Sequence, residues 1–247
     1  MRVSRTLRVE VHETHVRATL DRPEKRNAID RDLVDALHSL CAELEREPRT
    51  LILTGAGGIF AAGADIAQLR ERRAADALEG INTHCFARIR ALPMPVIAVV
   101  DGYALGGGAE LAYAADIRIG TPALRIGNPE TGLGIIAAAG ATWRLREIVG
   151  EPLAAEILLT GRVLDAAEAL AAGLVTQVLE PDEARAEAER IAARIAALDH
   201  AATQATKRAL LAPRDAHPAI DLHEQAVLFE SPEKERRMTA FLERKRT

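Results

Sequence analysis

Two glutamates stand alone in stretches of small and apolar residues. Glu110 follows the run Gly106–Ala109 and precedes the apolar run Leu111–Ala115, and Glu130 lies among the glycines of Gly127–Gly134. A carboxylate is costly to bury, and burial near a second carboxylate raises the pKa towards the range that proton transfer needs. The pair therefore predicts acid–base chemistry. Two glutamates that only cap loops are the structural alternative.

Two glycine-rich loops each lead into a helix-like segment. The first is Gly55–Asp65 and the second is Asp101–Glu110. Where such a loop becomes a helix, the first backbone N–H groups have no partner inside the helix and lie at the positive end of its dipole. Two converging ends would form an oxyanion hole, which stabilises developing charge on a carbonyl oxygen. The alternative is that the glycines only permit tight strand-to-helix turns.

Other catalytic motifs are missing from the sequence. None of the three serines lies in a GxSxG elbow, which argues against a serine hydrolase. The seven histidines form neither HExxH nor another ligand spacing, so we expect no metal site. The run Gly55–Gly58 could begin a dinucleotide-binding loop, but Phe60 occupies the position of its last glycine. No GxxxxGK phosphate loop occurs either.

Strands and helices in alternation must position the loops and the glutamates. Leu7–Leu20 alternates apolar and polar residues and predicts two strands of a hairpin, and Ile29–Leu44 has helical spacing, with Asp30 as its cap. Thr50–Thr54 and Pro95–Val100 read as buried strands that lead into the glycine loops. Further short strands are expected at Ile117–Gly120 and Gly173–Val178. This order favours an α/β architecture.

The chain changes character after Asp182. Ala, Glu and Arg dominate from there, no glycine remains, and apolar residues keep helical spacing. Breaks near Leu198–Ala201, Pro213 and Ser231-Pro232 predict four helices, and the last of these carries Met238, Phe241 and Leu242.

Composition narrows the class of protein. The 247 residues, 48% of them apolar, suffice for one large domain or two small ones, and 32 basic against 36 acidic residues give no general attraction to nucleic acid or an anionic membrane. Cys41 and Cys85 form no disulfide framework or zinc motif, which favours the reducing cytoplasm. The longest uncharged apolar run, Ala91–Val100, is too short for a membrane span, and no signal-peptide pattern is visible.

Several motifs in order resemble the crotonase (enoyl-CoA hydratase/isomerase) superfamily, over almost the whole chain. These motifs are Arg22–Ala28, Phe60–Ile66, Pro95–Ala98, Gly102–Leu111, Pro129–Gly134, Leu159–Gly161, Ala171–Val175 and Phe241–Arg246. The resemblance implies an α/β, crotonase-like spiral of ββα units with a C-terminal helical region. Residues 1–190 would form the core with an acyl-CoA site. Residues 191–247 would be a helical oligomerisation region, in a homotrimer or a hexamer built as a dimer of trimers.

The resemblance also assigns roles to single residues. The backbone N–H groups of Ala64 and Gly107 would bind the thioester oxygen of an acyl-CoA. Lys25, Arg26 and Ala28 would lie near the adenine and pantetheine, and Ala62 would line the same channel. Phe241 and Arg244 of a neighbouring subunit would approach the nucleotide. CoA would enter as part of the substrate, so no separate cofactor, metal, nucleic acid or membrane partner is expected.

Both acidic positions are filled, which by the resemblance indicates a hydratase. Water would add syn to a trans-2-enoyl-CoA to give a 3-hydroxyacyl-CoA, with Glu110 as the base and Glu130 as the acid that protonates C2. Double-bond isomerisation and non-catalytic acyl-CoA binding are the alternatives. The acyl group and the pathway, be it fatty acid, amino acid or aromatic degradation, stay open.

Three features depart from the family pattern. Alanines replace the usual glycines at Ala137–Ala141, where we expect added methyl groups beside Glu130, and Trp143 replaces a glutamine. Ala67 replaces a lysine that approaches the CoA phosphates, so Arg70, Arg72 or Arg73 would have to take its place. The segment Gln68–Ile89 corresponds to the family's variable wall of the acyl pocket.

Overall fold

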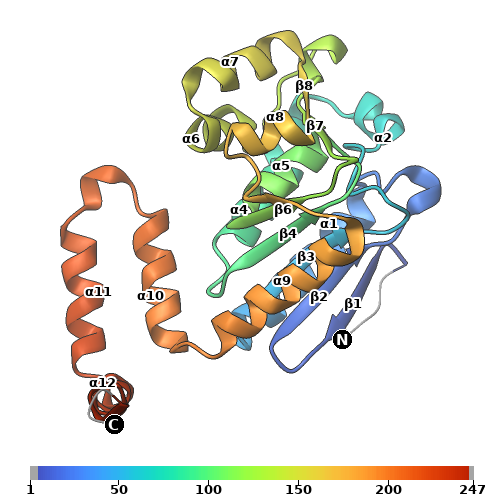
Figure 1. Ribbon diagram of the computed structural model, residues 1–247. Coiled ribbons are helices and arrows are strands. Elements are labelled where there is room, and N and C mark those ends of the chain that lie inside the picture. Colours follow the sequence, from blue (N-terminus) through green and yellow to red (C-terminus); the bar gives the residue numbers. More distant parts are fainter. Residues whose placement is uncertain (1–4, 245–247) are drawn as a thin grey trace. The chain divides into compact units, whose positions relative to one another are not determined.

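Two compact units make up the chain. The computed structural model describes residues 5–244, drawn in Figure 1. The first unit extends to Ala193 and the second begins at Arg194. The sequence places this boundary between residues 190 and 191, and the role of the second part in oligomerisation stays a prediction.

The main sheet of the first unit has six strands in the order β1-β2-β3-β4-β6-β9. Their bounds are β1 (Leu7–Val11), β2 (His15–Leu20), β3 (Thr50–Gly55), β4 (Val96–Val100), β6 (Ile117–Gly120) and β9 (Gln177–Val178). The strands β1 and β2 form the predicted antiparallel hairpin, and all later neighbours pair in parallel. Strands of a parallel sheet are covered on both faces, which explains the continuous apolar run of β4.

The last strand is shorter than the sequence predicts. Of the expected strand Gly173–Val178, only the second half joins the sheet: β9 pairs with β6, and the N–H of Thr176 donates to the carbonyl of Arg118 at 2.9 Å. The N–H groups of Leu174 and Val175 both donate to the carbonyl of Ala169 instead, at 2.9 and 3.3 Å. This first half of the segment therefore closes the turn after α8 (Ala166–Ala171) and has no free donors for the sheet.

A second sheet has three short strands, β5 (Tyr103–Leu105), β7 (Arg125–Gly127) and β8 (Val163–Asp165). Three-residue strands are too short to show a period of two, so no sequence pattern predicts them. From β4 in the main sheet the chain crosses to β5 in the second sheet and continues into α5 (Gly107–Ala114). The same crossing occurs again from β6 to β7. These ββα units confirm the predicted fold class.

Helices surround the sheets of the first unit. The predicted helix is α1 (Arg31–Arg46), and its cap is Asp30, whose Oδ1 accepts the N–H of Leu33 at 2.9 Å. The helix α1 packs against α4 (Ile81–Arg90), which in turn packs against α5. The remaining helical elements are η1 (Pro23–Lys25), α2 (Ile66–Glu71), α3 (Ala74–Glu79), η2 (Glu130–Leu133), η3 (Ala141–Leu145), α6 (Arg146–Val149), α7 (Glu151–Thr160) and α9 (Pro181–Ala196).

The second unit contains the end of α9 followed by α10 (His200–Leu211), η4 (Arg214–Ala216), α11 (Ala219–Phe229) and α12 (Pro232–Arg244). The four helices predicted after Asp182 are thus confirmed. An ion pair between Arg208 and Glu224, at 2.7 Å, joins α10 to α11. Large apolar side chains on this unit are more than half exposed, namely Leu198, Leu210, Leu222, Val227, Phe229, Met238, Phe241 and Leu242.

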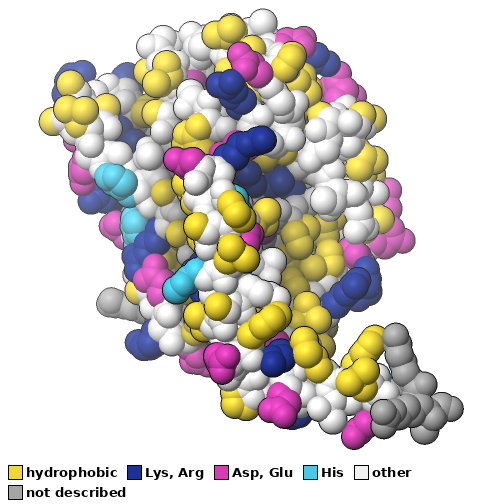
Figure 2. Space-filling model, turned by 90° about the vertical axis from the view of Figure 1, so that its left-hand side faces the viewer, with side chains coloured by type: hydrophobic (Ala, Val, Ile, Leu, Met, Phe, Trp, Pro, Cys, Tyr) yellow, Lys and Arg dark blue, Asp and Glu magenta, His cyan; other side chains and the backbone are white. Residues whose placement is uncertain are grey.

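Hydrophobic side chains are also visible among charged ones on the molecular face that Figure 2 shows. None of the helices within residues 5–244 combines the length and the apolar content that a membrane crossing requires.

Candidate active site

A cavity of about 680 Å³ opens in the first unit. The loop that precedes α2, the segments from α2 to α4, the start of α5 and the residues around η2 form its walls. Most of the lining is apolar, including Ile66, Leu69, Ile81, Leu133 and Ile136. A concave apolar site with a few polar groups is typical of small-molecule binding.

Backbone hydrogen bonds bring the two glycine-rich loops together. The N–H of Ala61 donates to the carbonyl of Tyr103, and the N–H of Leu105 donates back to the carbonyl of Ala61, both at 3.0 Å. The start of α5 packs closely on the first loop. A Cβ on Gly108 would lie only 2.1 Å from the carbonyl oxygen of Ala61. A Cβ on Gly107 would lie only 3.7 Å from the nitrogen of Ala64. The structure therefore brings the two predicted amides side by side.

The free donors have different origins. Among residues 5–244, neither the N–H of Ala64 nor that of Gly107 has an acceptor. Gly107 is the first residue of α5, as the helix-start argument requires. That argument is wrong for Ala64, which lies before α2. Asp65 caps α2 by accepting the N–H groups of Ala67 and Gln68, so this helix end is occupied by its own side chain.

Glu110 lies within α5 and is 4% exposed. Its Oε1 accepts two hydrogen bonds, from the N–H of Ala139 at 2.7 Å and from that of Ala141 at 3.1 Å. Gly140 stands between these donors with a φ of 135°, a value that favours glycine and turns both neighbouring amides towards one oxygen. Burial, together with the nearby charge of Glu130, raises the pKa of Glu110 to about 7 against the lowering effect of the two amides.

Glu130 begins the short turn η2 and is 8% exposed. Its Oε1 accepts a long hydrogen bond of 3.4 Å from Nδ2 of Asn128, and its Oε2 is buried with no partner among the described residues. Burial raises the pKa of Glu130 above its ordinary value. Both glutamates line the same cavity as the free amides of Ala64 and Gly107.

The alanines between residues 137 and 141 lie at the site of the two glutamates. Ala139 and Ala141 hold Glu110 through their backbone N–H groups. Ala138 and Ala139 also line the cavity that contains Glu130, and an effect of their methyl groups on Glu130 stays a prediction.

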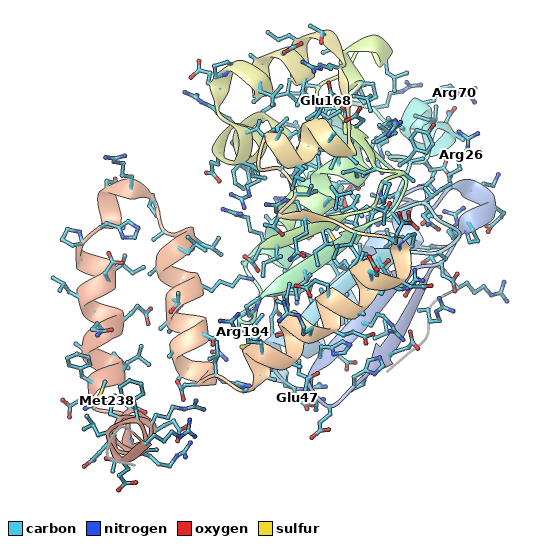
Figure 3. The ribbon with its side chains drawn as sticks, in the orientation of Figure 1. Arg26, Glu47, Arg70, Glu168, Arg194 and Met238 are labelled. Atoms are coloured by element: carbon cyan, nitrogen blue, oxygen red, sulfur yellow. The ribbon has the colours of Figure 1, made fainter. Side chains whose placement is uncertain are left out.

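The predicted CoA residues of the first unit lie along one edge of the cavity. The segment 26–29 runs beside residues 62–65, because the N–H of Ala62 donates to the carbonyl of Arg26 and the N–H of Ile29 donates to that of Gly63. Lys25 and Arg26 are exposed, Ala28 is half-buried, and Ala62 lines the cavity. Arg26 and Arg70 appear on the same side of the first unit in Figure 3.

Sequence reasoning missed Asn27, which holds this edge together. The side-chain oxygen of Asn27 accepts the N–H of Arg22, and its amide group donates to the carbonyls of Ala56 and Ile59. Asn27 has a φ of 55°, a conformation that asparagine tolerates better than most residues. The sequence signal for this role is the asparagine that follows Lys25 and Arg26 in a polar turn, because asparagine often bonds backbone groups in turns.

Two of the three arginines proposed to replace the missing lysine reach the cavity. Arg72 and Arg73 line it, whereas Arg70 is mostly exposed and pairs with Glu71 at 3.0 Å. Asn82 was also missed: a Cβ on Gly107 would lie 3.6 Å from its Nδ2, so the amide borders the paired N–H groups.

Phe241 and Arg244 lie on α12, in the second unit, and their predicted place beside the nucleotide is not tested by the fold of either unit. No cluster of three or more His, Cys, Asp or Glu side chains suited to a metal ion occurs within residues 5–244.

Comparisons of sequence and of structure with known proteins both point to one family. The family model described as enoyl-CoA hydratase/isomerase matches residues 10–247. The short-chain-enoyl-CoA hydratase of Clostridium acetobutylicum is 37% identical, and the crotonyl-CoA hydratase of Syntrophomonas wolfei is 36% identical; each match covers 92% of this chain and 91% of the relative. The crystal structure of an enoyl-CoA hydratase from Bacillus anthracis superimposes with a TM-score of 0.91 at 29% identity, over 97% of this chain and 96% of that one.

Proposed function

This chain belongs to the enoyl-CoA hydratase/isomerase family, and from its site we propose that it is an enoyl-CoA hydratase. It adds water to a trans-2-enoyl-CoA and forms a 3-hydroxyacyl-CoA. The observation that carries the proposal is the presence of two buried glutamates with raised pKa values in the cavity that also holds two free, adjacent N–H groups.

The amides of Ala64 and Gly107 bind the thioester oxygen in this proposal. Two donors on that oxygen draw electron density from the conjugated double bond, so C3 becomes electrophilic. Negative charge then collects on the oxygen as an enolate-like species. Donors fixed by the backbone need no reorganisation as this charge develops, and each is worth about 3 kcal/mol or more to the transition state.

The two glutamates position and activate the water. Oε1 of Glu110 is held by two amides, which leaves its other oxygen to accept a proton from water as the water oxygen bonds to C3. Glu130 then gives a proton to C2, and the sum is one water added across the double bond. Burial raises the pKa of both glutamates, that of Glu110 to about 7, and the proposal has the pair share one proton, as base and acid require.

The coenzyme part of the substrate binds at the edge of the cavity. Lys25 and Arg26 supply cations for the CoA phosphates, with Ala28 and Ala62 beside the pantetheine. Phe241 and Arg244 of a neighbouring subunit complete the nucleotide site in a homotrimer or hexamer. Because the thioester carries its own CoA, the reaction needs no further cofactor.

Isomerisation of a 3-enoyl-CoA is the second candidate. It requires a single group that takes a proton from one carbon and returns it to another. Glu130, with a raised pKa and a buried Oε2 that has no partner, fits such a shuttle. Incubation of a 3-enoyl-CoA in deuterated water separates the two proposals, since isomerisation gives a 2-enoyl-CoA and no 3-hydroxy product.

The test of the hydratase proposal is the loss of enoyl absorbance with crotonyl-CoA and with longer 2-enoyl-CoA substrates. The matched variants are Gly107→Ala and Gly108→Ala. The first fits without a close contact, with its nearest neighbours at 3.6 to 3.8 Å, but places a methyl group beside the amide of Ala64. We expect it to stay folded and to lose at least ~10²-fold in kcat.

Gly108→Ala, unlike Gly107→Ala, should not fit into the folded protein. Its methyl group meets the carbonyl of Ala61 at 2.1 Å, so we expect it to destabilise the protein. Tight acyl-CoA binding without turnover by the unaltered protein would instead indicate a non-catalytic binder. Absence of turnover at every chain length would overturn the hydratase proposal.

A further inference from the structure

The segment from Ala138 to Leu145, called here the Trp143 segment, forms the support of Glu110. Its amides at Ala139 and Ala141 are the two donors on Oε1. The N–H groups of Trp143 and Arg144 fold back to the carbonyl of Gly140, at 3.3 and 2.7 Å, so the donors and the bulky side chains belong to one turn. Anything that moves this turn also moves both donors.

Side-chain contacts attach the segment to two helices. Towards α4, Oγ1 of Thr83 donates to the carbonyl of Ala138 at 3.1 Å, and the guanidinium of Arg90 lies over the ring of Trp143, 5.5 Å from its centroid. Towards α5, Nε of Arg144 donates to the carbonyl of Tyr113 at 3.2 Å. Tyr113 lies three residues after Glu110 on α5, so Arg144 joins the donor segment to the helix that carries the acceptor.

Glu147 connects the two arginines of this support. It pairs with Arg90 at 3.3 Å and with Arg144 at 3.0 Å, and the two arginine side chains are only 15% and 16% exposed. Paired and largely buried guanidinium groups hold a fixed geometry better than free surface ones. The Trp143 segment is therefore held at the carbonyl of Ala138, at the ring of Trp143 and at the side chain of Arg144.

We propose that Trp143 and Arg144 are positioning residues for Glu110, which act through the amides of Ala139 and Ala141. The inference rests on the proposed function, in which Glu110 must be ionised to accept a proton from water. Two N–H hydrogen bonds, at 2.7 and 3.1 Å, favour the carboxylate over the acid. Loosening of the segment lengthens these bonds, so Glu110 becomes ionised only at higher pH.

The charged groups around Glu110 have to be separated from this effect. Glu130 faces it from η2, Tyr113 lies next to it on α5, and Arg90 and Arg144 border the same small space beside its side chain. Removal of an arginine therefore removes a positive charge as well as a contact. Arg144→Lys keeps the charge and loses the planar Nε donor, and Trp143→Ala removes no charge at all.

The experiment measures the pH dependence of kcat/KM for the unaltered full chain, Trp143→Ala, Trp143→Phe and Arg144→Lys. We expect the acid limb to move up by about one pH unit in Trp143→Ala and Arg144→Lys. Their rates would then be about tenfold low near pH 6 and would approach the unaltered rate above pH 8. Trp143→Phe keeps an aromatic face under Arg90, so its acid limb should stay close to that of the unaltered protein. Arg146→Ala, at an exposed ion pair with Glu151 in the next helix, is the matched control and should not move the limb.

A second readout does not depend on activity. The carboxyl carbon of Glu110, labelled with ¹³C and assigned by its loss in Glu110→Gln, reports its titration by NMR, and the same upward shift is expected in Trp143→Ala. A rate that falls equally at all pH values, or a titration that does not move, would overturn the inference. If the unaltered protein hydrates no enoyl-CoA, the proposed function is overturned. The NMR titration would then still decide whether Trp143 and Arg144 position Glu110.

Discussion

Glu110 and Glu130 share one cavity but are held in opposite ways. Glu110 lies inside a helix, and one of its oxygens is fixed by two backbone amides at 2.7 and 3.1 Å. Glu130 lies in a short turn, has a single side-chain donor at 3.4 Å, and keeps one buried oxygen without a partner among the described residues. A fixed carboxylate suits the aiming of water, whereas a less constrained one suits delivery of a proton to carbon. The comparison therefore supports the proposed roles, with Glu110 as the base and Glu130 as the acid.

The largest effect expected is the loss of either carboxylate. Glu110→Gln and Glu130→Gln should each lower kcat by about 10²- to 10⁴-fold, because general acid–base groups contribute on this scale. The measurement is the hydration rate with crotonyl-CoA, together with the exchange of the C2 proton of a saturated acyl-CoA in deuterated water. If the two roles are separate, Glu130→Gln abolishes hydration and exchange together, and Glu110→Gln retains more of the exchange. Equal loss of exchange in both variants would break the comparison.

A shorter acid sharpens the difference. Glu110→Asp withdraws the carboxylate by one methylene from amides that cannot follow it, and a misplacement of about 1 Å can cost about 10²-fold in rate. Glu130→Asp should cost clearly less, because its turn and its long bond to Asn128 leave room to adapt. The two kcat values under saturating substrate test this. A larger loss for Glu130→Asp would show that Glu130 is the more tightly placed of the two.

Different parts of this site differ in how far the sequence predicts them. The glutamates, the glycine loops and the strands β3 and β4 were predicted, since a charge in an apolar run and a buried strand leave local patterns. The resemblance added the pairing of Ala64 with Gly107, which no local pattern gives because they lie 43 residues apart. The bonds from Ala139 and Ala141 to Glu110 were missed, because backbone donors carry no sequence signature. The strands β5, β7 and β8 were not predicted, because three residues are too few to show an alternating pattern.

The buried acid also leaves a trace in stability. The folded state raises the pKa of Glu110 to about 7, so the folded protein binds more protons than the unfolded chain between the ordinary pKa near 4.5 and 7. Stability must then fall as pH rises through this window, by about 3 kcal/mol in total. Glu110→Gln cannot ionise and should lack this loss.

Urea unfolding at pH 5 and pH 8, at one protein concentration, gives the difference between the unaltered protein and Glu110→Gln. Glu130→Gln should change the slope with the same sign, because burial raises that pKa as well. If the free energy of unfolding rises between pH 5 and pH 8 by the same amount in the unaltered protein and in Glu110→Gln, then Glu110 titrates in its ordinary range.

The smallest effect concerns the link between the two glutamates. Tyr113, one turn after Glu110 on α5, donates its hydroxyl to Oδ1 of Asn128 at 3.1 Å, and Nδ2 of Asn128 donates to Glu130. Tyr113→Phe leaves a buried amide oxygen without this donor, which should cost about 1 kcal/mol of stability. Glu130 keeps its own donor, so we expect kcat to fall only about threefold, equivalent to less than 1 kcal/mol. A loss near that of Glu130→Gln would instead mean that Glu130 depends on this chain of bonds for its placement, and that the two acids are held as one unit.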